Sequence, residues 1–239
     1  MRMTPTFAKR AAQLGLALAA MGASAMALAS DYPNRPIRLI VGFSPGSGND
    51  GSARLLAKSM SEELGQPVVV DNKPGAGGQI GTDLVAKAPP DGYTLGLGTS
   101  SQLVMNVAVF SKLPFDVDAD LRPIGLVSKS NMVLVSSKDS PATLAELIAK
   151  AKAKPGNYTY GSAGPGSISH IVAEAFAQAA GIQLRHVPYK GNAAAMADLA
   201  AGHINLVFDG VQNSVGLTEK SGGHVLATAG SKRQPSLPQ

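Results

Sequence analysis

Short apolar runs alternate with longer segments of helical spacing along residues 37–208 of this chain. The runs are rich in Val, Ile and Leu and are too short for most helices, so they predict buried strands. The segments between them repeat apolar residues at helical intervals and predict helices. The expected strands are residues 37–41, 68–70, 94–97, 124–127, 132–136, 157–160, 184–187 and 204–208. The expected helices are residues 52–64, 80–88, 103–109, 143–153, 168–180 and 193–201.

Capping signals support these helix boundaries. Thr143-Leu-Ala-Glu146 is a capping box at the start of one helix, and Gly181 and Gly202 follow two others at the position that favours glycine. Strands that alternate with helices predict an α/β fold whose sheets are parallel and covered on both faces.

Two glycine-rich turns each join an expected strand to an expected helix. Backbone N–H groups at such a turn, together with the positive end of the helix dipole, favour an anion. Two turns so far apart in the chain suggest two lobes that close on one small anion. The candidate ligand-binding residues of the turns are Phe43, Ser44, Gly46, Ser47, Gly48, Asn49, Asp50, Ser162, Ala163, Gly164, Gly166 and Ser167. Thr99, Ser100 and Asp209 complete the set, and His170, in the first turn of the second helix, is expected to orient the loop or touch a ligand.

The first thirty residues predict export. A basic start that ends at Arg10 precedes an uncharged apolar run over residues 11–28, and Ala27-Leu-Ala29 is a cleavage signature before Ser30. We therefore expect residues 1–29 to be a removed signal peptide. The chain has no cysteine, which excludes lipid attachment, disulfides and thiolate metal sites.

Charge and composition narrow the function further. The expected signal peptide holds three of the 21 basic residues and none of the 16 acidic ones, so the 210 residues after it carry a net charge of +2. This near balance removes the main support for nucleic-acid binding. The chain has no Trp, and nothing after the signal approaches membrane-spanning length.

Gly46-Ser-Gly-Asn-Asp-Gly51 matches the dinucleotide-binding pattern, and Asp71 ends the next strand at a distance suited to a ribose hydroxyl. An exported protein rarely meets such a cofactor, so we expect these glycines only to open a helix against a sheet. No cofactor is expected. The four histidines lack metal-binding spacing, so no metal site is expected either.

Gly42-Phe-Ser-Pro-Gly46 also matches the nucleophile elbow of α/β hydrolases, which would make Ser44 a catalytic serine. The oxyanion hole of that motif requires the N–H of the residue after the serine. That residue here is Pro45, which has no N–H. An exported hydrolase that uses Ser44 therefore stays a minor alternative.

Four long motifs carry a resemblance to a known family: residues 32–43, 64–78, 88–94 and 186–191. In this order they resemble the substrate-binding proteins of tripartite tricarboxylate transporters, also called the Bug family, over residues 31–238. The resemblance implies a type II periplasmic-binding fold of two α/β lobes with a ligand cleft between them. It also implies a carboxylate ligand, such as a di- or tricarboxylate or an acidic amino acid, held mainly by backbone amides of the two turns.

The same resemblance implies a periplasmic, monomeric receptor that is not an enzyme. Its partners would be the small organic acid and either the membrane permease subunits of a transporter or a sensor protein. Ser47 stands where the family commonly has glycine. We expect lobe 1 at residues 30–128, lobe 2 at residues 129–224, and the start of a return to lobe 1 at residues 225–239.

Family members continue beyond the last residues of this chain. We therefore expect the C-terminal elements of the fold to be missing, lobe 1 to be the less stable half, and an apolar patch to be exposed on it. A non-functional fragment of a binding protein is the third alternative.

Overall fold

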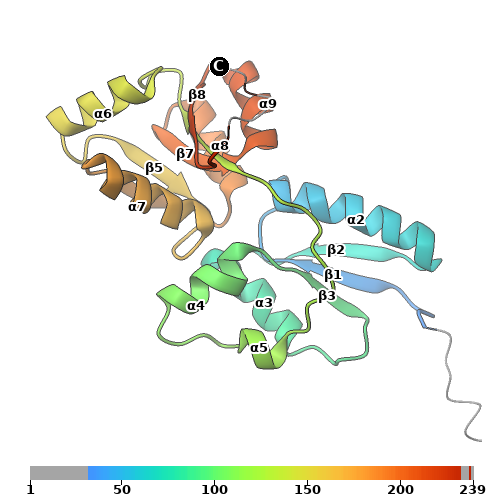
Figure 1. The fold of residues 1–239 in the computed structure, drawn as a ribbon. Helices are drawn as coiled ribbons and strands as arrows, with labels where there is room; N and C mark the ends of the chain where they lie inside the picture. Colours follow the sequence, from blue (N-terminus) through green and yellow to red (C-terminus); the bar gives the residue numbers. More distant parts are fainter. Residues whose placement is uncertain (1–31, 233–236, 238–239) are drawn as a thin grey trace, which may run out of the picture.

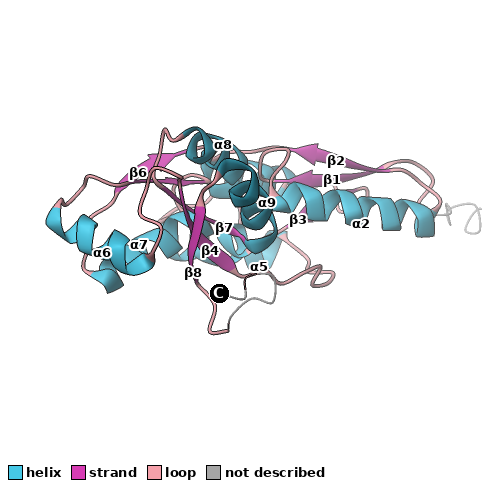
Figure 2. Ribbon diagram, turned by 90° about the horizontal axis from the view of Figure 1, so that it is seen from above, coloured by secondary structure: helices cyan, strands magenta, loops and turns pink. Residues whose placement is uncertain are grey.

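The computed structural model describes residues 32–232 and residue 237, so the expected signal peptide lies outside the described residues. The described chain forms two β-sheets that are both associated with helices (Figure 1). Seen from above in Figure 2, the two sheets lie at opposite ends of an elongated molecule. None of the helices in the described residues is both long and apolar enough to cross a membrane.

The first sheet is parallel, with the strand order β2-β1-β3. Its strands are β1 (Ile37–Val41), β2 (Val68–Asn72) and β3 (Thr94–Leu97). Helix α2 (Gly48–Leu64) connects β1 to β2, and the short turn η1 (Ala76–Gly78) and helix α3 (Gln79–Ala86) connect β2 to β3. Apolar side chains of the central strand β1 and the small residues Ala53 and Ala57 of α2 form its core. The expected helix and strands of this region are thus confirmed.

A connecting region follows β3. It contains a single π-helical turn, η2 (Ser101–Met105), and the short helices α4 (Asn106–Val109) and α5 (Val117–Asp120). The expected strand at residues 124–127 is wrong, because this segment has no regular secondary structure and Ile124 is 83 % exposed. A strand needs a neighbour for its backbone groups, and no described strand pairs with this segment.

The second sheet has the order β6-β5-β7-β4-β8. Its strands are β4 (Met132–Ser136), β5 (Thr159–Ser162), β6 (Arg185–Pro188), β7 (Leu206–Gly210) and β8 (His224–Thr228). The expectation of parallel sheets is wrong here, because β4 runs antiparallel to both β7 and β8. The chain enters β4 from the first sheet through the irregular segment before it. It does not pass through a crossover helix, which is the connection that makes neighbouring strands parallel.

Helices cover both faces of the second sheet. They are α6 (Leu144–Ala153), α7 (Ile168–Ala180), α8 (Asn192–Ala201) and α9 (Val211–Ser221), of which α9 was not expected from the sequence. Leu134 packs in a cluster with residues of α6 and α7, whereas Val133 and Val135 pack in a cluster with residues of α8 and α9. This alternation along β4 is the period-two pattern of a strand buried on both sides. Thr143 is confirmed as the N-cap of α6, since its hydroxyl accepts from the Glu146 N–H at 3.2 Å.

The exposed large apolar side chains of the described residues all lie between residues 32 and 127. The most exposed are Leu55, Ile124 and Leu126, at 73 %, 83 % and 74 %. The corresponding side chains of the second sheet and its helices are buried or half-buried. The exposed apolar side chains therefore lie on the half of the chain where the sequence places a patch, which stays a prediction.

Candidate functional site

Each of the two glycine-rich turns contacts the part of the chain that forms the other sheet. Each turn follows the carboxyl end of a parallel strand, β1 in the first sheet and β5 in the second, which is where α/β folds usually bind ligands. The Ser44 hydroxyl donates to the Lys190 carbonyl at 3.0 Å. The Ile168 N–H, in the first turn of α7, donates to the Ser101 hydroxyl at 2.8 Å. These bonds join parts of the chain that lie 146 and 67 residues apart.

Asp50 organises the first turn. Its carboxylate accepts hydrogen bonds from the Gly46 N–H, the Asn72 amide and the Arg54 guanidinium, each at 3.0 Å. Burial alone would raise the pKa of Asp50, but the bonds from Arg54, Gly46 and Asn72 hold it below its ordinary value. Ser47 caps α2 by accepting from the Asp50 N–H. The charge of Asp50 therefore braces the turn, and the Gly46 N–H is already engaged.

The second turn is braced by side chains of its own lobe. The Ala163 and Gly164 N–H groups donate to the Ser169 and Ser162 hydroxyls at 3.0 and 3.1 Å. The Gly166 N–H donates to Nδ1 of His170 at 3.3 Å. The Ser167 N–H donates to the Gly164 carbonyl at 3.1 Å. A carboxylate that used these N–H groups would therefore exchange with their present partners.

The second turn meets the first lobe through glycines that have no room for a side chain. Gly166 has a φ of +74°, and a Cβ there would lie 2.7 Å from Oδ1 of Asn106 and in contact with the Phe110 ring. Gly77 has a φ of +62°, and a Cβ there would lie 2.7 Å from the Pro165 carbonyl. Side chains at either position would hold the lobes apart.

A buried polar network lies behind the second turn. Asn192 donates to Asp209 at 2.8 Å and to the Phe208 carbonyl at 2.9 Å, and accepts from the Ser169 hydroxyl at 3.0 Å. Burial raises the pKa of Asp209, although bonds from Asn192, Gly210 and Asn213 oppose the shift. Asn213 faces the first lobe, because a Cβ on Gly48 would lie 3.1 Å from its amide nitrogen. Asp209 is thus placed between the second turn and the start of α2.

The remaining predicted site residues differ from one another in burial and in their hydrogen bonds. Phe43 is buried in the core of the first lobe, and Asn49 is half-buried in α2. Thr99 bonds to Gln102 through both its N–H and its hydroxyl. Ser100 is exposed. Of the predicted site residues, the two turns and Asp209 thus have contacts at the boundary between the lobes, whereas Ser100 is exposed.

Sequence reasoning missed four contributors from the first lobe: the loop at residues 73–78, Ser101, Gln102 and Asn106. The last three are at most 1 % exposed, although all are polar. The glycine-rich sequence Lys73-Pro-Gly-Ala-Gly-Gly78 was a usable signal for the loop. Nothing local marked Ser101 or Asn106, because their contacts to Ile168 and Gly166 lie in the other lobe.

Two histidines and a tyrosine stack behind the second turn. The rings of His170 and His186 lie 4.3 Å apart and those of His186 and Tyr160 4.8 Å apart. His186 also bonds through Nε2 to the Ser162 hydroxyl at 2.7 Å. Burial, with the neighbouring His170, lowers the pKa of His186, while Glu174 opposes the shift. Burial and the hydrogen bond to Glu174 raise the pKa of Tyr160.

We expect the melting temperature to fall between about pH 7 and pH 5, partly because of His186. Its pKa in the folded protein lies below the ordinary value of 6.5, so the unfolded chain binds this proton more readily. The stability that neutral His186 contributes is therefore present above about pH 6.5 and is lost as the pH falls through the folded pKa. Melting curves of the wild type and His186→Gln test this, because the substituted protein should lose less on acidification. Equal losses in the two proteins would rule out His186 as the cause.

The structure gives no support to the hydrolase and dinucleotide readings. Ser44 donates its hydroxyl hydrogen to a backbone carbonyl, and no described histidine bonds to it. Asp71 is paired with Arg38 at 2.6 Å and with Lys73 at 3.1 Å. Within the described residues, no group of three or more potential ligands is placed to hold a metal ion.

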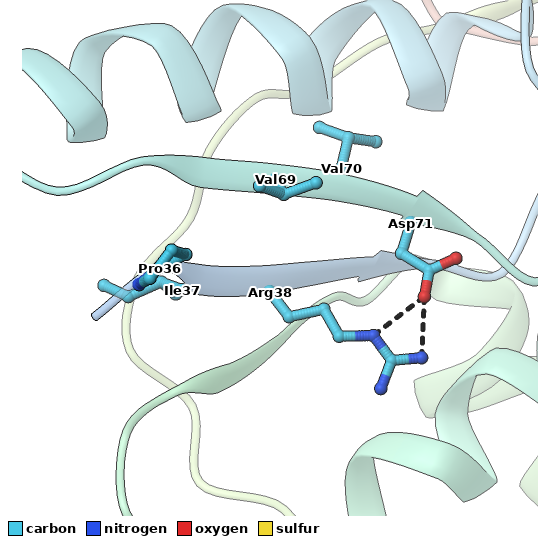
Figure 3. Close-up of a pocket in the computed structure, with 6 residues that line it drawn as sticks. All are labelled: Pro36, Ile37, Arg38, Val69, Val70 and Asp71. Carbon is cyan, nitrogen blue, oxygen red and sulfur yellow. Dashed lines mark hydrogen bonds and ion pairs between the residues drawn. The ribbon is translucent and has the colours of Figure 1, made fainter.

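A groove of about 400 Å³ lies elsewhere, along β1 and β2 (Figure 3). Its polar side chains already pair with each other, since the Arg38 guanidinium holds Asp71 through two nitrogens, at 2.7 and 2.6 Å. It is lined by Pro36, Ile37, Arg38, Val69, Val70 and Asp71. The paired turns are therefore the better candidate site.

Known proteins share most of this chain. Residues 52–239 match the sequence profile described as the tripartite tricarboxylate transporter family receptor. Protein BugT of Bordetella pertussis is 39% identical over 232 residues, a match that covers 95% of this chain and 70% of BugT. This chain belongs to that receptor family. The resemblance seen in the sequence is therefore confirmed, and so is the absence of an enzymatic role, because the family is one of receptors.

Solved structures of similar proteins have the same fold. Rpa4515 of R. palustris, solved with adipate, is 35% identical to this chain with a TM-score of 0.81. The match covers 84% of this chain and 68% of the Rpa4515 chain. MatC of Rhodopseudomonas palustris, solved with bound malate, is 30% identical with a TM-score of 0.81. The match covers 85% of this chain and 70% of the MatC chain. The expected fold class, an α/β periplasmic-binding fold of the type II kind, is thus confirmed.

Proposed function

We propose that this chain is an extracytoplasmic receptor that captures a small carboxylate for a tripartite tricarboxylate-type transporter. The observation that carries the proposal is membership of the receptor family over most of the chain. Relatives solved with adipate and with malate support a carboxylate ligand. The two glycine-rich turns lie at the carboxyl ends of β1 and β5, and each contacts the other lobe, which supports a site between the sheets.

The binding step follows from the contacts of the turns. The ligand carboxylate would take N–H donors at residues 44–50 and 162–167, exchanging with the side chains that now accept from them. Thr99, Ser100, His170 and Asp209 would surround the rest of the ligand. Lobe 1 at residues 30–128 and lobe 2 at residues 129–224 would close on it. The return to lobe 1, expected at residues 225–239, would begin only after β8, because β8 pairs with β4 in the second sheet. Closure of this kind is how two-lobed receptors signal occupancy.

Export and partners complete the proposal. Residues 1–29 would be removed before Ser30, which would leave a periplasmic protein that acts as a monomer. The closed form would be recognised by membrane permease subunits or by a sensor protein. Neither nucleic acid nor a cofactor would be a partner.

A thermal-shift screen tests the proposed function. Dicarboxylates, tricarboxylates, acidic amino acids and aromatic acids are each added to the purified protein, beside a chromogenic ester. Binding to the folded state raises the melting temperature, and the rise grows with the logarithm of the ligand excess. We expect at least one acid to stabilise the protein without any ester turnover. Turnover of the ester, or a melting temperature that no carboxylate changes, would contradict the proposal.

A further inference from the structure

Asn106 presents a buried oxygen that has no hydrogen-bond donor. The side chain is completely buried at the start of α4, and its Oδ1 has no partner among the described residues. Leaving a buried acceptor unsatisfied is costly, so such atoms are rare and call for an explanation. Asp83 holds the other such oxygen, but its carboxylate is paired with Lys87 at 2.6 Å.

The orientation of the Asn106 amide is fixed by its surroundings. Its nitrogen faces the Gly77 carbonyl at 3.5 Å, within the first lobe. Exchanging nitrogen and oxygen would place two acceptors against each other. Oδ1 therefore points to the other lobe, where a Cβ on Gly166 would lie 2.7 Å away.

The donors nearest to this oxygen in the second turn are already used. The Gly166 N–H donates to His170, and the Ser167 N–H donates to the Gly164 carbonyl. The Ile168 N–H donates to Ser101. The described residues of the turn thus have no free N–H group for Asn106 Oδ1. The start of α7, however, favours the binding of an anion close to this oxygen.

We propose that Asn106 Oδ1 accepts a hydrogen bond from the ligand, and that the ligand is a carboxylate with a hydroxyl or ammonium group beside it. The inference rests on the proposed function and adds the ligand class. A carboxylate at the start of α7 would place a donor on the adjacent carbon near Gly166, within reach of Asn106. A plain dicarboxylate would leave Oδ1 unsatisfied. The site would therefore select 2-hydroxy and 2-amino acids.

Calorimetric titrations with L-malate, L-aspartate and succinate test this selection, because the three acids share a carbon skeleton. The wild type should bind L-malate or L-aspartate at least about tenfold more tightly than succinate. Asn106→Leu removes the acceptor at similar volume and should bring the ratio to within about threefold. Ser101→Ala is the matched control, because it removes a contact between the lobes and should weaken all three acids while keeping the ratio.

The outcomes separate the two proposals. A wild-type ratio near one, as a buried water on Oδ1 would give, overturns the role of Asn106 without any variant. A ratio that survives in Asn106→Leu overturns it as well. If carboxylates without a 2-hydroxy or 2-amino group bind and acids that carry one do not, the ligand class is wrong and the receptor function stands. If no carboxylate binds at all, both proposals fail.

Discussion

Replacement of Gly166 by alanine is expected to lower carboxylate affinity at least about 100-fold. The positive φ of +74° costs an L-residue about 1–2 kcal/mol. The new Cβ would also lie 2.7 Å from Asn106 Oδ1 and press against the Phe110 ring, both in the other lobe. Relief of these contacts moves the second turn away from the first, so the closed arrangement loses stability. Calorimetric titration of the tightest-binding acid measures the loss.

Gly46→Ala provides the matched control. Its φ of +79° imposes similar backbone strain, but a Cβ there would have no neighbour within 4 Å. We expect its affinity loss to stay below about 30-fold, in keeping with strain of about 1–2 kcal/mol alone. Wild-type affinity in a folded Gly166→Ala protein would remove the second turn from the site. Equal losses in the two variants would show that the contact between the lobes has no part in binding.

Backbone amides of β3 are expected to exchange at least about 100 times faster than those of β7. Strand β3 lies at an edge of the first sheet, and all its residues are at least partly exposed. Strand β7 lies inside the second sheet, and Leu206 to Asp209 are buried. Local opening is easier where few apolar contacts cover the backbone. Hydrogen exchange followed by mass spectrometry measures both strands in one sample.

The same experiment reports on the first half of the chain as a whole. The exposed apolar side chains between residues 32 and 127 predict weak protection there, including β1 at the centre of the sheet. Strong and equal protection of β1 and β7 would contradict the expected difference in stability between the halves.

Local signals accounted for most of the fold. The apolar runs and caps are short-range features, and strands such as β1 and β4 appear where the runs predicted them. Residues 124–127 failed because an apolar run shows the capacity for a strand but not the presence of a neighbour. The direction of β4 failed because it depends on how the chain enters the second sheet, which no local pattern records.

The candidate site divides in the same way. The two turns were predictable because glycines after a strand act locally. The bonding of their N–H groups was not, since Asp50, Ser162 and His170 accept them through side chains that a backbone argument ignores. Asn106 could not be predicted either, because its proposed role in binding depends on its position beside Gly166 of the other lobe.

Backbone amide shifts in ¹⁵N-labelled protein test most directly whether a carboxylate binds between the two turns. During titration with the tightest-binding acid of the screen, the Gly46, Gly164 and Gly166 signals should shift and saturate together. Their N–H groups now donate to Asp50, Ser162 and His170, so an exchange of partners must change their shifts. Shifts confined instead to the groove at Arg38 and Asp71, with both turns unchanged at saturation, would contradict a site between the lobes.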